Sequence, residues 1–194
     1  TTINSAHSSP APLSNTENKM EFEISAGRNR LTTVGNSIIF TATATRLQNI
    51  GERAITYEWS FGDGTMERGS TVSHTYTFPG EYSVILNAYA SDKQAVSRTQ
   101  VKVISPTVAL NRISGGVEIF NKSGIEINLE GWNLKSGSKS FIFPKDTIIS
   151  VGNKVIFADK VTGIVGEDIN LSNPIGSLFA ATFPSLSLGI TTLD

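Results

Sequence analysis

The chain has 194 residues, of which 39% are hydrophobic and 17% charged, with no cysteine, two histidines and a formal net charge of -1. This length allows one large domain or two small ones, each able to bury a core of its own. The absence of cysteine excludes a disulfide framework, a thiolate zinc site, an iron–sulfur cluster and a cysteine nucleophile. The balanced charge provides no surplus of positive charge that would bind a nucleic-acid backbone.

Residues 1–20 consist mainly of Ser, Thr, Asn and Pro and contain almost nothing that could be buried. They show neither helical nor strand periodicity, which is typical of a disordered linker. We therefore predict a flexible N-terminal tether, and we interpret His7, which lies in it, as a solvated side chain.

From Glu21 onward, short runs of alternating apolar and polar residues, rich in Val, Ile, Thr, Phe and Tyr, are separated by Gly, Asn, Asp and Pro. This pattern predicts strands, and no longer window has the apolar spacing of a helix. An all-β chain with almost no helix is expected, built as sandwiches. The clearest predicted strands are 22–25, 37–45, 55–61, 81–90, 97–104, 117–120, 125–129, 139–143, 154–158 and 176–183.

A domain boundary is predicted at Ser105 to Thr107, where a strand ends and Pro106 interrupts any further ladder before a new set of strands. The expected division is a linker at 1–20, one sandwich at 21–105 and a second at 106–194. Residues 21–105 contain equal numbers of basic and acidic side chains, and the second segment is nearly balanced. Neither segment is therefore expected to be specialised by its charge.

Three aromatic residues of the first segment, Tyr57, Trp59 and Phe61, alternate along one predicted strand and share one face, which indicates a core. The sequences W-S-F-G-D-G-T at 59–65 and V-S-H-T-Y-T-F-P-G-E-Y-S-V at 72–84 make residues 21–105 resemble the polycystic kidney disease (PKD) repeat. This resemblance implies an Ig-like sandwich of the kind found in extracellular and cell-surface proteins.

Within this resemblance, His74 and Asp63 are interpreted as residues that maintain the fold, because no nucleophile pattern accompanies His74. Some PKD-type domains hold calcium through Asp-rich loops. Here the corresponding early loop, 46–54, contains no Asp, and the later loop offers Asp92 alone. Because calcium needs six to eight oxygen ligands, no calcium site is predicted.

The second segment resembles the lamin-tail domain, through V-E-I-F-N at 117–121, I-N-L-E-G-W-N-L at 127–134 and the run from Phe143 to Phe157. This family consists of Ig-like sandwiches that occur in nuclear lamins and in secreted or surface bacterial proteins. The resemblance weakens after residue 160, and the tail 186–194 has no assigned place.

Several side chains of the second segment allow two readings. Trp132 follows a glycine between apolar residues, which favours a core plug over an exposed sugar-stacking platform. Asn121 and Asn170 each begin an N-x-S triplet, the glycosylation acceptor pattern, which often occurs by chance. A set of three lysines is interpreted as a solvated edge that discourages strand addition, namely Lys135, Lys139 and Lys145.

No catalytic, cofactor-binding or metal-binding residue is predicted, no cofactor is expected, and the chain is predicted not to be an enzyme. The leading hypothesis is a non-catalytic extracellular or cell-surface module of bacterial origin. It would serve as a spacer and as an adhesion or protein-interaction domain pair, with a protein or polysaccharide ligand, no nucleic acid and no membrane contact. The alternative is a pair of accessory domains that hold polysaccharide or protein for a secreted hydrolase. Chromatin or nuclear-envelope association, by analogy with lamins, is disfavoured by the near-zero charge.

Overall fold

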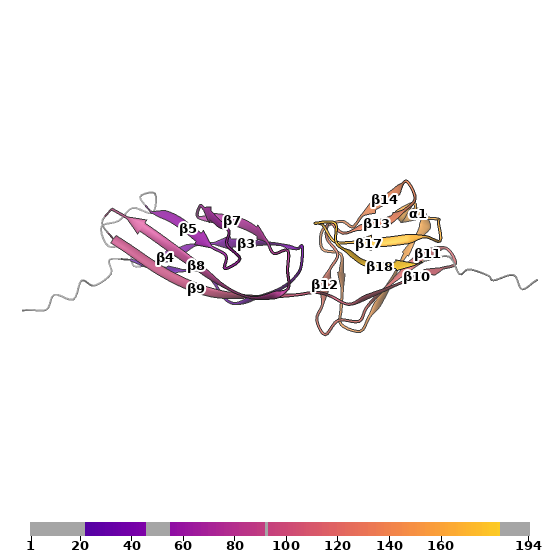
Figure 1. The fold of residues 1–194 in the computed structure, drawn as a ribbon, viewed down its shortest axis with the longest axis horizontal. Coiled ribbons are helices and arrows are strands. Elements are labelled where there is room, and N and C mark those ends of the chain that lie inside the picture. The colour runs from indigo at the N-terminus through magenta and orange to yellow at the C-terminus, as the bar shows by residue number, and fades with distance from the viewer. Residues whose placement is uncertain (1–21, 46–54, 92, 183–194) are drawn as a thin grey trace, which may run out of the picture.

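The computed structural model describes residues 22–45, 55–91 and 93–182. Within these ranges the regular elements are strands, apart from the single-turn helix α1 (Asp159–Thr162). They form two bodies that follow one another along the long axis of the molecule (Figure 1). The predicted all-β fold of two Ig-like sandwiches in tandem is therefore confirmed. The predicted tether, residues 1–20, lies outside the described residues.

The first sandwich has a five-stranded sheet in the order β2-β9-β8-β5-β6, in which β2 runs parallel to β9 and the other pairs are antiparallel. The facing layer contains two antiparallel pairs, β1-β4 and β3-β7. The strands are β1 (Glu23–Ser25), β2 (Arg30–Thr33), β3 (Ser37–Thr41), β4 (Thr43–Thr45), β5 (Thr56–Ser60), β6 (Met66–Arg68), β7 (Thr71–Thr75), β8 (Gly80–Ala90) and β9 (Lys93–Ile104).

Aromatic rings fill the centre of the first sandwich, as the alternation along β5 predicts. Trp59 and Phe61 are fully buried, and Tyr57 packs against the same cluster from its half-buried position. The ring centroid of Phe40, in the facing layer, lies 5.5 Å from that of Trp59 and 5.3 Å from that of Phe61. These contacts join the two layers without a disulfide.

The second sandwich combines a sheet in the order β10-β11-β16 with a sheet in the order β14-β13-β17-β18, and the short pair β12-β15 completes it. All of these pairs are antiparallel. The strands are β10 (Val108–Ile113), β11 (Gly116–Asn121), β12 (Ile127–Asn128), β13 (Asn133–Ser136), β14 (Lys139–Ile142), β15 (Ile148–Ile149), β16 (Lys154–Ala158), β17 (Ile169–Ser172) and β18 (Leu178–Thr182).

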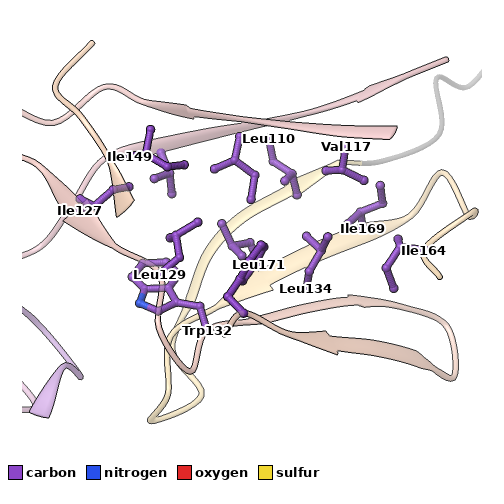
Figure 2. Close-up of a cluster of buried hydrophobic side chains, with 13 residues drawn as sticks. Leu110, Val117, Ile127, Leu129, Trp132, Leu134, Ile149, Ile164, Ile169 and Leu171 are labelled. Atoms are coloured by element: carbon purple, nitrogen blue, oxygen red, sulfur yellow. The ribbon is translucent and has the colours of Figure 1, made fainter. Parts of the chain in front are cut away.

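The core of the second sandwich is a separate cluster, whose side chains all come from residues 108–171 (Figure 2). Ile127 and Leu129 are fully buried while Glu126 and Glu130 are exposed, as the alternation of apolar and polar residues in this run predicts. Trp132 belongs to this cluster and Trp59 belongs to that of the first sandwich. The two tryptophans therefore do not share an interior.

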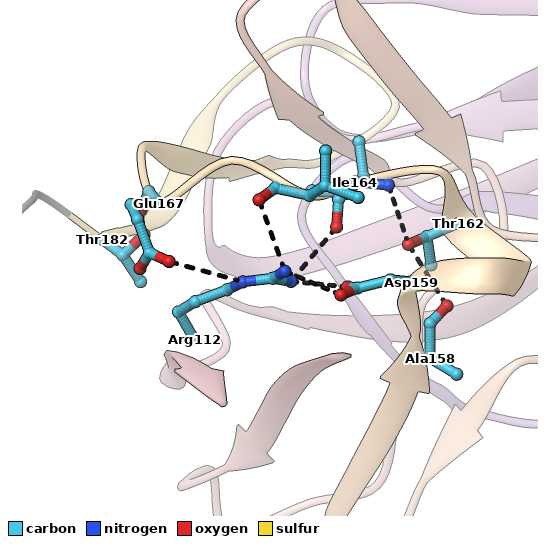
Figure 3. Close-up of polar contacts among 8 residues, drawn as sticks. Arg112, Ala158, Asp159, Thr162, Ile164, Glu167 and Thr182 are labelled. Atoms are coloured by element: carbon cyan, nitrogen blue, oxygen red, sulfur yellow. Dashed lines mark hydrogen bonds and ion pairs between the residues drawn. The ribbon is translucent and has the colours of Figure 1, made fainter. Parts of the chain in front are cut away.

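A polar clamp attaches α1 and the loop after it to β10 (Figure 3). Arg112 donates from both terminal nitrogens to the carboxylate of Asp159, at 2.6 and 2.7 Å, and to the carbonyl of Ile164 at 3.1 Å. Glu167 lies 4.0 Å from the same guanidinium. The planar guanidinium thus fixes a segment that has little regular structure of its own.

The predicted strands and the observed ones differ in two ways. The run 37–45 is not one strand but two, since β3 pairs with β7 and β4 pairs with β1, with the break at Ala42. Several short strands lie outside the clearest predicted runs. These are β2, β6, β7, β10, β13, β15 and β17.

Candidate functional site: the junction between the sandwiches

The two sandwiches meet through polar loops at their facing ends. Asn36, in the turn between β2 and β3, donates from Nδ2 to the carbonyl of Asn128 at 3.2 Å and accepts at Oδ1 from Trp132 Nε1 at 3.3 Å. Asn173 of the second sandwich donates to the carbonyl of Val34 at 3.2 Å in a buried bond. Three side chains therefore link segments that are 92 to 139 residues apart in the sequence.

Asn173 is preorganised for this contact. Its side chain is 2% exposed, and its Oδ1 accepts from the backbone amide of Ser177 at 2.7 Å. The backbone amide of Asn173 also donates to the carbonyl of Ser177 at 3.0 Å, so two hydrogen bonds hold Asn173 in this turn. A buried amide whose oxygen is already satisfied can direct its Nδ2 at a single acceptor, here Val34.

Gly35 permits the close approach of the two halves. Its φ is +84°, a conformation that L side chains rarely adopt, and its amide donates to the carbonyl of Tyr76 at 3.0 Å. A Cβ built at this position would lie 2.5 Å from Asn173 Nδ2. Glycine is therefore required both by the backbone and by the neighbouring sandwich.

Trp132 has two roles at once. The predicted core plug is found, because the side chain is fully buried and its ring lies 4.8 Å from that of Phe179. Figure 2 shows the indole at one end of the core, with its nitrogen directed away from the other labelled side chains. That nitrogen reaches Asn36 of the first sandwich, so the core of one half positions a donor for the other.

A groove of about 380 Å³ lies beside these bonds. Among the described residues that line it, Glu130 has the one ionisable side chain. The groove is lined by Gly35, Asn36, Ser37, Thr75, Asn128, Glu130, Gly131, Pro174 and Ile175.

Replacing Gly35 with alanine is expected to open the junction, since the new methyl group would collide with Asn173 and the positive φ would be strained. The indole N–H resonance of Trp132 should shift, because its acceptor Asn36 is the next residue. Gly115→Ala is the matched control, with a φ of +78° and no atom within 4 Å of the added Cβ. An unchanged Trp132 indole resonance in Gly35→Ala would contradict the described junction.

The predicted fold residues Asp63 and His74 lie together on the first sandwich. His74 Nε2 is 2.8 Å from Asp63 Oδ2, and the His74 ring stacks on Phe61 with centroids 4.0 Å apart. Asp63 also accepts from the amide and the hydroxyl of Thr65, at 3.1 and 2.6 Å. The pair thus ties the Gly62–Gly64 turn to β7.

Asp63 gives this turn a pH dependence. Burial by itself raises the pKa of Asp63, but the hydrogen bonds from Thr65 and His74 outweigh it and leave the pKa below its ordinary 3.8. A lowered carboxyl pKa stabilises the fold above the ordinary pKa, and this contribution is lost as the pH falls through the folded-state value.

The isosteric Asp63→Asn variant should therefore lose less unfolding free energy than the wild type between about pH 5 and about pH 2. Denaturant unfolding at a series of pH values measures the difference. Parallel pH profiles for the two proteins would show that the Asp63 carboxylate contributes nothing.

The two predicted glycosylation triplets have different surroundings. Asn121 is fully buried, and its Nδ2 donates to the carbonyls of Ile125 at 2.8 Å and Ile149 at 2.9 Å. Its Oδ1 accepts from the amide of Ser123 at 2.8 Å. The triplet at 121 is therefore a structural element and not an accessible acceptor, while Asn170 is half-buried on β17.

The three lysines predicted as a solvated edge are all exposed. Lys139 does lie on an edge strand, β14, but Lys135 lies on β13, which is paired on both sides by β14 and β17. Lys135 therefore does not protect an edge, which corrects part of the prediction.

In residues 22–45, 55–91 and 93–182, no group of three or more His, Asp or Glu side chains is placed to hold a metal ion. The loop 46–54 and Asp92, on which the calcium prediction depends, lie outside the described residues. The single-turn α1 is also far too short to cross a bilayer, and no other helix occurs in the described part of the chain.

Comparison with known proteins finds a family match for residues 23–105. The model of the PKD domain family matches residues 23–105, which confirms the PKD resemblance of this segment. Human polycystin-1-like protein 1 is 26% identical over 106 residues, which is 52% of this chain and 4% of that protein. Protein QNR-71 of Coturnix japonica is 34% identical over 61 residues, which is 30% of this chain and 10% of that protein. The chain thus spans a small fraction of either relative.

Among solved structures, the PKD domain of human KIAA0319 is 18% identical, with a TM-score of 0.40, and the match covers 50% of this chain and 93% of that one. A structure described as carbohydrate-binding modules from the β-sandwich superfamily is 16% identical, with a TM-score of 0.34. The match covers 72% of this chain and 78% of that one. The lamin-tail resemblance of residues 106–194 stays a prediction.

Proposed function

We propose that this chain is a non-catalytic extracellular or cell-surface module, in which two sandwiches in series act as a spacer and as an adhesion or protein-interaction pair. The observation that carries the proposal is the junction. Asn36, Trp132 and Asn173 hold the sandwiches end to end through polar bonds, while each sandwich keeps its own core. Such a unit separates its two ends and leaves loops and strand edges free for binding.

The PKD match supports the cellular location, because PKD domains usually occur in extracellular or surface proteins. It also supports a non-catalytic role, because the PKD domain is a non-catalytic Ig-like fold. Residues 21–105 would form this first domain and residues 106–194 a lamin-tail-like second domain. The gap between the end of β9 at Ile104 and the start of β10 at Val108 supports that division.

Accessory binding for a secreted hydrolase is the alternative role, and it predicts a row of exposed aromatic rings on one sheet. Among the described residues, the large exposed aromatic side chains are Phe78 and Tyr89, which are 72% and 40% exposed. They lie near opposite ends of the eleven-residue strand β8 and so do not form a row. Retention of the purified protein on chitin, cellulose or collagen would favour this role over the spacer.

Small-angle X-ray scattering of the purified chain tests the spacer role. The expected distance distribution is that of an elongated particle with two separated maxima, one for distances within a sandwich and one for distances between sandwiches. A compact particle, with the sandwiches packed side by side, would overturn the proposal. The Gly35→Ala and Gly115→Ala variants serve as the open-junction sample and its control.

A further inference from the structure

A second groove, of about 650 Å³, opens on the side of the first sandwich between β2 and β3. Each of these strands belongs to a different layer, so the groove lies where the two layers of the sandwich are not joined. Its lining residues come from two short stretches of the chain, 28–32 and 37–39. Two of them, Leu31 and Ile39, are apolar and 53% and 65% exposed.

Both strands offer a free edge to this groove. Within the described residues β2 pairs with β9 alone and β3 pairs with β7 alone. Alternate residues of an antiparallel strand direct their main-chain groups to opposite sides. Because the amide of Ala42 bonds toward β7, at Ser70, the main chain of Ile38 and Phe40 also faces β7 and that of Ile39 faces away.

The groove is positively charged. Arg28 and Arg30 both line it, and neither forms an ion pair with any carboxylate of the described residues. The Arg30 guanidinium lies 4.3 Å above the Phe40 ring, and its Nη1 is buried without a hydrogen-bond partner. Burial lowers the pKa of Arg30, and the neighbouring charge of Arg28 lowers it further. Two unneutralised cations in one groove favour an anionic ligand.

We propose that this groove binds an extended acidic peptide segment of a protein partner. The peptide would add to the free edge of β3 through the main chain of Ile39, with its carboxylates facing Arg28 and apolar side chains on Leu31 and Ile39. Unpaired main-chain groups complement another peptide backbone, and none of the described residues that line the groove is an aromatic platform for sugar rings. The inference rests on the interaction role proposed above and is independent of the spacer role.

Fluorescence anisotropy with the full chain tests the proposal. The probe is a labelled peptide of about eight residues that alternates valine and glutamate, which matches one strand length. We expect it to bind, and we expect Arg28→Glu to weaken binding at least about tenfold. Arg98→Glu is the matched control, since Arg98 is also exposed but lies on β9 and does not line the groove, and it should change the affinity less than about twofold.

Two further probes distinguish binding by main-chain pairing at the β3 edge from binding by charge alone. The same peptide with alternate backbone amides methylated should bind at least about tenfold more weakly, because it cannot complete the pairing. Polygalacturonate, an acidic polysaccharide, should not displace the peptide. Amide resonances of Leu31 and Ile39 should shift during titration of the valine–glutamate peptide.

Four results would overturn the proposal: no peptide binding at about 1 mM, equal losses in Arg28→Glu and Arg98→Glu, full binding of the methylated peptide, or Arg28-dependent binding of polygalacturonate in preference to the peptide. None of them alters the scattering profile. Failure of this inference is therefore distinguishable from failure of the spacer function.

Discussion

Replacing Trp59 with alanine is expected to destabilise the first sandwich by about 4 kcal/mol, within the range measured for large aromatic side chains removed from cores. Trp59 is fully buried and its ring packs against Phe40 of the facing layer. Its Nε1 donates to the carbonyl of Gly69 at 3.0 Å, so the substitution also leaves that acceptor without its partner. Denaturant unfolding followed by far-UV circular dichroism measures the loss.

The same variant tests whether the two cores are separate. In Trp59→Ala the remaining tryptophan is Trp132, whose ring lies in the core of the second sandwich and whose Nε1 donates to Asn36 of the first. When the first sandwich unfolds, we expect a small spectral shift from the loss of the Asn36 bond, while the emission stays that of a buried indole because the ring packs against Phe179 in the second core. Leu31→Ala, at an exposed side chain, controls for the loss of apolar volume. Loss of the Trp132 signal at the same denaturant concentration as the first sandwich would show that the two halves unfold as one unit.

Replacing Asn121 with alanine is expected to destabilise the second sandwich by about 3 kcal/mol, because several buried polar groups lose their partners together. The carbonyls of Ile125 and Ile149 and the amide of Ser123 all bond to this one side chain. Denaturant unfolding followed through the indole N–H resonance of Trp132, which is separate from that of Trp59, measures the change in the unfolding free energy of the second sandwich.

Asn170→Ala is the matched control for Asn121, since Asn170 also begins an N-x-S triplet but is only half-buried. This substitution should lower the unfolding free energy of the second sandwich by less than about 1 kcal/mol. Equal effects of the two substitutions would contradict the structural role of Asn121, as would the attachment of a glycan to Asn121 in the folded protein.

The sequence predicts best the strands whose burial pattern is strict. In β8 the side chains of Val84, Leu86 and Ala88 are buried in alternation with more exposed neighbours, and such a pattern is visible without a structure. The four-residue strands β13 and β17, N-L-K-S and I-N-L-S, have one and two apolar residues, too few to form a distinctive pattern. They become strands because they pair with each other and with β14 and β18, which local propensity does not reveal.

The junction is also beyond what the sequence alone can show. Asparagines in turns, such as Asn36 and Asn173, are common and carry no signal that they bond across a domain boundary. Trp132 was predicted as a core plug, and it is one, but its second partner lies 96 residues away. The glycine at position 35 is visible in the sequence, but its positive φ and its closeness to Asn173 are not, and glycine in a turn usually needs no further explanation.

Residual dipolar couplings of the full chain in a dilute aligning medium measure most directly whether the two sandwiches are held in one orientation. If Asn36, Trp132 and Asn173 fix the junction, amide couplings from residues 22–45, 55–91 and 93–104 and those from 108–182 will fit a single alignment tensor. Two tensors of different magnitude or direction would mean that the halves reorient independently, and the account of a fixed end-to-end spacer would be wrong.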